Sequence, residues 1–167
     1  MLQSYKLFND SECEVLINWI ESYNKDWEVF TLPTKRCKKK SFGKSLLYYD
    51  RIKLKVKEIL DIDADSEVGC LKYETGDLFG VHNDAKIDNE GFHDDWIWNV
   101  NIQLTSPHEY KGGELIYKDG LYKIDKGNIY TYRSNEPHGV KLVESGIRYC
   151  IVFYIRARDF NMKKNLI

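Results

Sequence analysis

From residue 66 onward the sequence consists of short apolar runs separated by turn residues, and this pattern limits the possible folds more than any other feature. The runs are rich in Val, Ile, Tyr, Phe and Trp, and Gly or Pro residues lie in most of the breaks. We predict strands near 67–74, 78–83, 97–105, 113–118, 121–124, 128–132, 138–143 and 147–156. Because no helical segments alternate with these strands, the pattern argues against a parallel sheet and indicates a double-stranded β-helix, or jelly roll.

The N-terminal part of the chain differs, because its apolar residues recur at helical spacing. One helix is predicted to begin near Ser11, which has the spacing of a capping box with Glu14, and a second helix is predicted over 45–60. Residues 33–45 between them are rich in Lys and Arg and are predicted to form a solvated basic loop. We therefore expect an α+β fold, mainly β and cupin-like, with the N-terminal helices packed on one sheet.

The length and composition fit one folded domain. A chain of 167 residues is long enough for a full core, and we assign 1–167 to one domain, with helical support over 1–65 and a jelly-roll core over 66–158. Hydrophobic residues make up 43% and charged residues 31%, which excludes disorder of the whole chain. The net charge of −1 argues against nucleic-acid binding as the main role.

The cysteines and the N-terminus bear on the compartment. The four cysteines form no C-x-x-C pair, so the sequence favours reduced thiols over a zinc ribbon or a dithiol redox motif. The N-terminus lacks the features of a signal peptide, and no run approaches the length of a membrane span. We expect a cytoplasmic monomer or homodimer with no membrane partner.

Three residues form a candidate metal site. His82 and Asp84 are two positions apart, so in an extended strand their side chains point to the same side. His138 lies on a later predicted strand and supplies a third ligand. Two histidines and one carboxylate on one face of a metal ion leave open positions, which is the facial triad of non-haem Fe(II) oxygenases.

Arg148 is the second informative feature. It follows His138 by ten residues on a predicted strand that is otherwise apolar. A buried charge is costly without a partner, so we infer a buried anion near Arg148. A guanidinium can pair in bidentate fashion with the far carboxylate of a bound 2-oxoacid. Strand alternation places Cys150, Val152 and Tyr154 on the same face as Arg148.

Together these residues resemble the Fe(II)/2-oxoglutarate-dependent dioxygenases, and among them the prolyl 4-hydroxylase-like proteins. The resemblance covers roughly 67–156 and includes spacing as well as residue type. The matching residues are Tyr73-x-x-Gly76-x-x-Phe79-x-x-His82-x-Asp84, then Tyr110-Lys111-Gly112-Gly113-Glu114-Leu115, then His138 and Arg148.

The resemblance implies an enzyme that hydroxylates an unactivated C–H bond, by family a prolyl residue in a protein or peptide. It would consume O₂ and 2-oxoglutarate and release succinate and CO₂, with Fe(II) as the metal and ascorbate as a further candidate cofactor. The implied iron ligands and catalytic residues are His82, Asp84 and His138.

The resemblance also implies roles for residues around the metal. Arg148 would bind the far carboxylate of 2-oxoglutarate, and Tyr73 and Asn99 would be further cosubstrate contacts. Tyr154, Trp96 and Trp98 are candidates for the substrate pocket. Trp96-Ile97-Trp98 stands where prolyl hydroxylases often carry an Arg, a departure that concerns proline specificity and not the iron site.

Several alternatives stay open. The same chemistry on a nucleic acid ranks second, supported by the basic stretch 35–44, and a free amino acid is a further substrate class. A non-catalytic cupin-like metal-binding module is the alternative from another class. The segment 85–96 is a candidate loop over the pocket mouth, and its His93-x-Asp95 is a second, weaker candidate ligand pair. His108 lies in a turn and is expected to be exposed.

Overall fold

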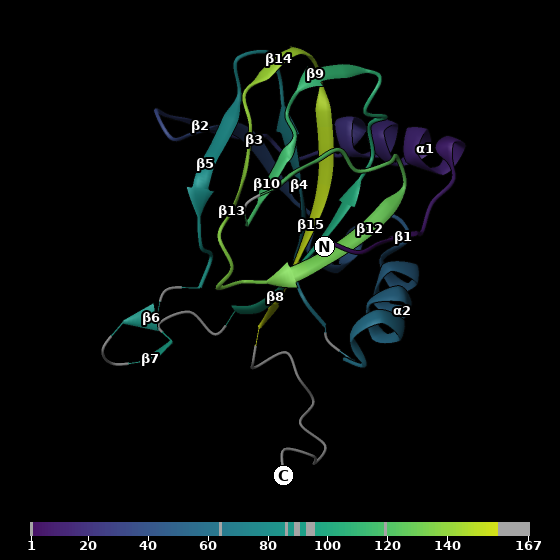
Figure 1. The fold of residues 1–167 in the computed structure, drawn as a ribbon. Helices are drawn as coiled ribbons and strands as arrows, with labels where there is room; N and C mark the ends of the chain where they lie inside the picture. The colour runs from purple at the N-terminus through teal and green to yellow at the C-terminus, as the bar shows by residue number, and fades with distance from the viewer. Residues whose placement is uncertain are drawn as a thin grey trace.

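The computed structural model describes residues 2–63, 65–85, 87–88, 91–92, 96–118 and 120–156 (Figure 1). Its helices are α1 (Asp10–Ser22), the 3-10 helix η1 (Gly43–Ser45) and α2 (Tyr49–Leu60). Its strands are β1 (Ser4–Lys6), β2 (Glu28–Leu32), β3 (Lys35–Ser41), β4 (Val68–Tyr73), β5 (Leu78–His82), β6 (Ile87–Asp88), β7 (Gly91–Phe92), β8 (Trp96–Gln103), β9 (Tyr110–Gly112), β10 (Leu115–Tyr117), β11 (Gly120–Tyr122), β12 (Asn128–Arg133), β13 (His138–Val140), β14 (Val143–Gly146) and β15 (Arg148–Arg156). No helix in the described part of the chain is long and apolar enough to cross a bilayer.

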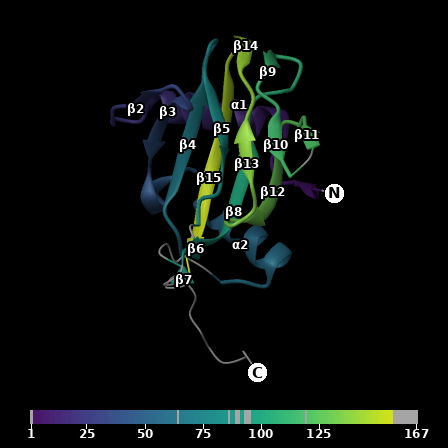
Figure 2. The same ribbon diagram turned by 60° about the vertical axis from the view of Figure 1, so that its left-hand side comes forward.

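The strands curl into the expected jelly-roll-like arrangement. Eleven of the described strands form one antiparallel sheet in the order β1-β12-β8-β15-β4-β3-β5-β13-β10-β11, and β2 adds to β3. β3 joins the two halves, because it pairs with β4 through Lys38–Ser41 and with β5 through Lys35 and Arg36. Figure 2 shows β5 and β13 side by side, with β15 and β4 in the other half. The mainly β fold predicted from the strand pattern is confirmed.

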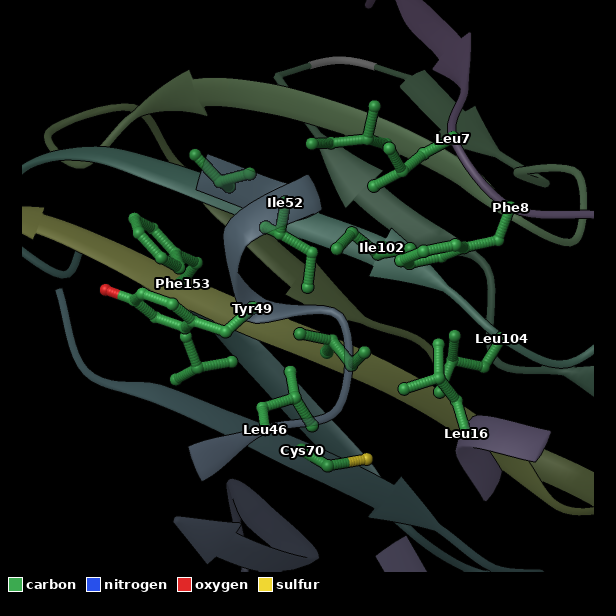
Figure 3. Packing of buried hydrophobic residues seen from close by; sticks show 14 of the residues in the cluster. Leu7, Phe8, Leu16, Leu46, Tyr49, Ile52, Cys70, Ile102, Leu104 and Phe153 are labelled. Carbon is green, nitrogen blue, oxygen red and sulfur yellow. The ribbon is translucent and has the colours of Figure 1, made fainter. Parts of the chain in front are cut away.

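The larger core lies between the helices and the β4–β15–β8 half of the sheet. Figure 3 shows Ile52 and Tyr49 of α2 facing Phe153 of β15 and Ile102 of β8. The alternation predicted for β15 holds, since Ile151, Phe153 and Ile155 pack in this core while Arg148 and Val152 line the pocket on the other face. Burial of these apolar side chains is the main stabilising contribution to the fold.

The cap of α1 differs from the one predicted. The capping box joins Asn9 and Glu12, whereas Ser11 and Glu14 do not form one. The Asn9 side chain accepts a hydrogen bond from the Glu12 backbone N–H over 2.9 Å, and the Glu12 carboxylate accepts one from the Asn9 N–H over 2.8 Å. Ser11 is already inside the first turn, and its hydroxyl donates to the Asn9 side chain. The helix therefore starts one residue earlier than the predicted cap.

The prediction of a solvated loop over 33–45 is wrong. Most of this segment is β3, which pairs with β2 along one edge and with β4 and β5 along the other, and Cys37 and Lys40 on it are buried. The Lys40 ammonium donates to the carbonyl of Ile20 over 2.9 Å, at the end of α1. Pairing with two neighbouring strands outweighs the low strand propensity of lysine. The first 65 residues thus add β1, β2 and β3 to the sheet, which differs from a purely helical support.

The helix predicted over 45–60 is shorter than expected. Gly43–Ser45 forms the separate 3-10 helix, and α2 begins only at Tyr49. Tyr48 has φ of 64°, in the left-handed region, so the helix cannot continue backward through it. Of the segment 85–96, the pair β6–β7 is described, while His93 and Asp95 lie outside the described residues.

Candidate functional site

A pocket lies between the two halves of the sheet. The space between them measures about 470 Å³ including its open mouth. It is lined by Leu71, Tyr73, Phe79, His82, Asp84, Asn99, Val100, Asn101, Leu115, Tyr130, Tyr132, His138, Gly139, Val140, Arg148, Cys150, Val152 and Tyr154. The candidate ligands His82, Asp84 and His138 and the candidate anion partner Arg148 therefore share one pocket.

The three candidate ligands converge because of strand pairing. β5 ends at His82 and β13 begins at His138, and these two residues are direct partners in the sheet. Asp84 lies just beyond β5, where its backbone N–H donates to the Ser134 carbonyl over 2.9 Å. One ligand atom from each of the three side chains lies within 4.8 Å of the others. The sequence predicts that His82 and Asp84 point to the same side because both lie on one extended strand. In the structure β5 ends at His82, and the bend that follows brings Asp84 toward the same point.

The hydrogen bonds of the two histidines leave one nitrogen of each ring for a metal. Nδ1 of His82 lies 2.8 Å from the Gly80 carbonyl, and Nδ1 of His138 lies 2.8 Å from the Glu136 carbonyl. A carbonyl only accepts, so both Nδ1 atoms carry the proton and donate it. Each Nε2 then points to the Asp84 carboxylate at 3.2 Å. A cation between two imidazole lone pairs and a carboxylate is the arrangement these donors favour.

Asp84 is held as a carboxylate. Its burial favours the neutral acid, but the neighbouring side chains of His138 and His82 outweigh the burial and hold the pKa of Asp84 below its ordinary value. A third partner is Asn99 of β8, whose Nδ2 donates to Asp84 Oδ2 over 2.6 Å. Asn99 is predicted to be a cosubstrate contact, and the structure places it in the pocket with its amide on the carboxylate of the candidate ligand Asp84.

Aromatic rings support the two imidazoles. The Phe79 ring stacks on His82 with centroids 3.9 Å apart, and Tyr132 packs on His138 at 4.6 Å. These contacts restrict rotation of the two imidazole side chains. Phe79 belongs to the motif quoted above, whereas Tyr132 was not predicted as a site residue. The signal for it was the alternation in Asn128–Arg133, which places Tyr130 and Tyr132 on one face.

Arg148 lies deeper in the same pocket. It is only 2% exposed, and its Nη2 donates to the Tyr130 hydroxyl over 3.3 Å while its Nε has no hydrogen-bond partner. No ion pair joins it to a carboxylate within the described ranges. Tyr73 is its strand partner, and the guanidinium lies 5.5 Å from the centre of the Tyr73 ring. A buried, always charged guanidinium with neutral neighbours is suited to an incoming carboxylate.

The pocket face of β8 carries a row of amides. Asn99, Asn101 and Gln103 are all buried, and each has one amide atom without a hydrogen-bond partner. Leaving a buried polar atom unpaired costs about 1–3 kcal/mol. Asn99 and Asn101 line the pocket, so their unpaired atoms also mark it as a place for a polar ligand.

The residues predicted to line the substrate pocket differ in where the structure places them. Tyr154 lines the pocket next to Asn99, which is its partner on the neighbouring strand β8. Trp98 is on the other face of β8, where it packs against the helix-covered core and under the guanidinium of Arg133 at 4.1 Å. The structure therefore does not bring Trp98 into the pocket, because neighbouring residues of a strand point to opposite faces. Trp96 starts β8 as the backbone partner of Arg156, two residues from Trp98. His108 is exposed, as expected.

The sequence matches a family model over residues 68–156, that of the 2OG-Fe(II) oxygenase superfamily. The chain belongs to this superfamily. The matched segment contains the whole candidate site, from Tyr73 to Tyr154. Two observations fit the metal and cosubstrate of this family. The Nε2 atoms of His82 and His138 lie beside Asp84 with free lone pairs, and within the described residues the buried guanidinium of Arg148 has no carboxylate partner.

Curated relatives in the oxygenase superfamily share this part of the chain. A PKHD-type hydroxylase of Rippkaea orientalis is 33% identical over 94 residues, which cover 52% of this chain and 40% of the relative. Another from Stenotrophomonas maltophilia is 28% identical over 92 residues, which cover 52% and 41%. The matched segment thus spans about two fifths of the length of these relatives.

Solved structures of oxygenases show the same fold over nearly the whole chain. The viral collagen prolyl hydroxylase of Paramecium Bursaria Chlorella virus-1, in complex with 2OG, superposes with a TM-score of 0.78 at 22% identity, covering 93% of this chain and 96% of that one. A prolyl-4-hydroxylase of Pseudomonas putida gives a TM-score of 0.71 at 14% identity, with 93% and 91% coverage. A prolyl hydroxylase of Trichoplax adhaerens, in complex with a peptide fragment, gives 0.65 at 14% identity, with 98% and 87% coverage.

Proposed function

We propose that this chain is an Fe(II)- and 2-oxoglutarate-dependent dioxygenase that hydroxylates a prolyl residue in a protein or peptide. The observation that carries the proposal is the pairing, in one pocket, of the His82–Asp84–His138 cluster with the buried guanidinium of Arg148. A metal site alone fits many proteins. A metal site that faces a buried cation without a carboxylate fits a ligand that carries a metal-chelating group at one end and a carboxylate at the other.

His82, Asp84 and His138 would hold the iron. Their backbone and side-chain partners fix the ring tautomers and the carboxylate orientation before any metal binds, which lowers the cost of assembling the site. When bound, Fe(II) with 2-oxoglutarate supplies the activation of O₂ that hydroxylation of a C–H bond requires. With three protein ligands, a bound metal would keep coordination positions open for the cosubstrate and O₂.

Arg148 would orient the cosubstrate. The far carboxylate would accept hydrogen bonds from the guanidinium, with the Tyr130 hydroxyl, which already contacts Arg148, close by. Tyr73 is 1% exposed and lies beside the guanidinium, so its ring excludes water from this end of the pocket. A dry pocket strengthens the attraction between the carboxylate and Arg148.

Support for a prolyl substrate comes from the relatives. The superposable structures include prolyl hydroxylases from a virus, from Pseudomonas putida and from Trichoplax adhaerens, the last bound to a peptide. Tyr154 lines the pocket on the side away from Arg148 along β15, and we propose it as a contact of the target residue. Ascorbate as a reductant, and a cytoplasmic monomer or homodimer, belong to the same proposal.

The first test is an anaerobic visible-absorption titration of the metal-free protein with Fe(II) and then with 2-oxoglutarate. We expect a weak charge-transfer band that needs both additions and is absent in His82→Ala. Mass gain of one oxygen on members of a proline-containing peptide library would then identify the substrate. A folded protein that binds metal but gives no band would contradict the proposal and favour a cupin-like binding module.

A further inference from the structure

Two lysines on the pocket face of β3 lie on aromatic rings instead of pairing with carboxylates. The Lys35 ammonium lies 3.7 Å from the centre of the Phe30 ring and 4.7 Å from that of Phe79. The Lys39 ammonium lies 5.7 Å from the centre of the Tyr154 ring. Both side chains are half-buried, and an ammonium group that lies on a ring keeps N–H donors for a ligand.

Lysines on the opposite face of β3 are satisfied by the protein itself. Lys38 pairs with Glu74 at 2.7 Å, and Lys40 donates to the Ile20 carbonyl at 2.9 Å. In the described ranges no ion pair within 4 Å joins Lys35 or Lys39 to a carboxylate. Glu28 is the strand partner of Lys39, and Glu67 lines a shallow groove with Lys39, Tyr154 and Arg156. Lysines on one face of β3 thus bind groups of the protein itself, whereas those on the pocket face keep donors for a ligand.

These lysines are connected to the metal site through ring contacts. His82 stacks on Phe79 at 3.9 Å, Phe79 contacts Lys35, and Lys35 contacts Phe30. Tyr154 joins Lys39 to the pocket interior. We call the set Phe30, Lys35, Lys39, Phe79 and Tyr154 the aromatic–lysine strip. It runs from the pocket across β5 and β3 to β2.

We propose that the aromatic–lysine strip binds a peptide segment that carries acidic side chains beside the residue to be hydroxylated. The proposal rests on the proposed function, and it adds the charge of the substrate. Carboxylates of the peptide would pair with Lys35 and Lys39, and its apolar atoms would lie on the exposed parts of the rings. Exposed Leu32 at the end of β2 extends the apolar surface.

A peptide fits the strip better than a nucleic acid does. Bases bind to single-strand binding proteins by stacking on open aromatic faces. Here Phe79 already stacks on His82, and Lys35 lies over both Phe30 and Phe79. Phe30 and Phe79 are therefore less suited to stacking with bases than rings without such contacts, and the two ammonium groups favour carboxylates.

The test measures binding of fluorescein-labelled peptides that share a central proline and differ only in flanking Glu, Gln or Lys residues. We expect the Glu-flanked peptide to bind tightest, and the preference to shrink with added salt because exposed charges are screened. The variant Lys35→Glu/Lys39→Glu should lose about tenfold affinity for the Glu-flanked peptide, as expected for two weak ion pairs replaced by repulsion.

The matched control is Lys25→Glu/Lys111→Glu, which changes the net charge equally. Lys25 and Lys111 are exposed and are not members of the strip. This variant should keep the preference for acidic peptides, because the effect of charge is local. An equal loss in both double variants, or no preference in the unmodified protein, would overturn the proposal. Tighter binding of a single-stranded oligonucleotide, lost in Lys35→Glu/Lys39→Glu, would overturn it in favour of nucleic acid.

The absorption band with Fe(II) and 2-oxoglutarate tests the proposed function independently of the aromatic–lysine strip. Lys35→Glu/Lys39→Glu should keep the band, since neither lysine touches the metal ligands or Arg148. A band without peptide preference would contradict the strip and leave the oxygenase standing. Preference for acidic peptides without a band would support the strip as a peptide site and contradict the oxygenase.

Discussion

Asn99 donates a hydrogen bond from Nδ2 to Oδ2 of Asp84 over 2.6 Å, and this bond links the central strand β8 to the candidate metal centre. Oδ2 of Asp84 also lies 3.2 Å from Nε2 of His138, so the amide fixes the carboxylate plane in the position where it meets the imidazoles. Asn99 is 2% exposed, and its position is set by β-pairing with both Tyr132 and Tyr154. The rigid sheet thus positions a ligand that itself lies in a bend.

Asn99→Ala should weaken metal binding about 10- to 100-fold, the usual cost of removing a partner of a metal ligand. The Asp84 carboxylate would lose its orienting donor while both histidines stay in place. Isothermal titration with Co(II) measures the effect directly. Asn101→Ala is the matched control, because Asn101 lies two residues along the same face of β8 and has no contact with Asp84. Equal weakening in both variants would contradict the positioning role.

Arg148→Met should raise the 2-oxoglutarate concentration needed for the absorption band by at least about 30-fold, because loss of one partner of a buried charge pair costs about 2 kcal/mol or more. Metal affinity should stay the same. In thermal unfolding, 2-oxoglutarate with metal should raise the Tm of the unmodified protein but not of the variant. Arg133→Met controls for the substitution, since Arg133 lies on Trp98 outside the pocket. A retained Tm shift in Arg148→Met would refute the assignment.

His82→Ala should abolish metal binding and turnover, because the two remaining ligands would hold iron poorly. A chelator should lower the Tm of the metal-loaded protein and leave that of the variant unchanged. His108→Ala is the control, since His108 is exposed and distant in sequence from the cluster. Full 2-oxoglutarate turnover by His82→Ala would show that the triad is assigned wrongly. His93→Ala is also predicted to stay near wild type.

Glu21 should contribute stability that disappears in acid. Partial burial raises its pKa, but hydrogen bonds from Lys72 and Tyr149 outweigh the burial, and the net pKa of Glu21 is lowered on folding. A lowered pKa in the folded state means stability that is full above the unfolded pKa, about 4.3, and lost as pH falls through the folded value. Urea unfolding of Glu21→Gln should therefore show lower stability at pH 7 and a shallower loss between pH 5 and 3. A pH profile parallel to the wild type would contradict this coupling.

Ile52→Ala should lower the free energy of unfolding by about 2–5 kcal/mol, since Ile52 is fully buried between α2 and the sheet (Figure 3). Leu54 lies two residues along the same helix and is 68% exposed. Leu54→Ala should change stability by no more than about 0.5 kcal/mol. Denaturant unfolding of both variants measures the difference, and similar losses would show that α2 does not pack as described.

Sequence patterns of short range predicted much of this protein correctly. Strand alternation gave the two faces of β15, and the spacing of His82, Asp84, His138 and Arg148 was sufficient to propose a shared pocket, which the fold provides. These features follow from a period of two residues and from residue types with few alternative uses. The period of two residues can be recognised along one strand without knowing which strands lie beside it.

Other features depended on contacts between distant segments. A lysine-rich stretch became strand β3 because β2 pairs with one of its edges while β4 and β5 pair with the other. Trp98 turned away from the pocket because of its register in β8. Asp84 accepts a hydrogen bond from Asn99, and Arg148 donates one to Tyr130. Both partners come from strands that only folding brings alongside. The sequence by itself determined which residues are candidates for the chemistry, and the tertiary structure decided which residues hold them in place, because hydrogen-bond partners across a sheet are set by strand register and not by local periodicity.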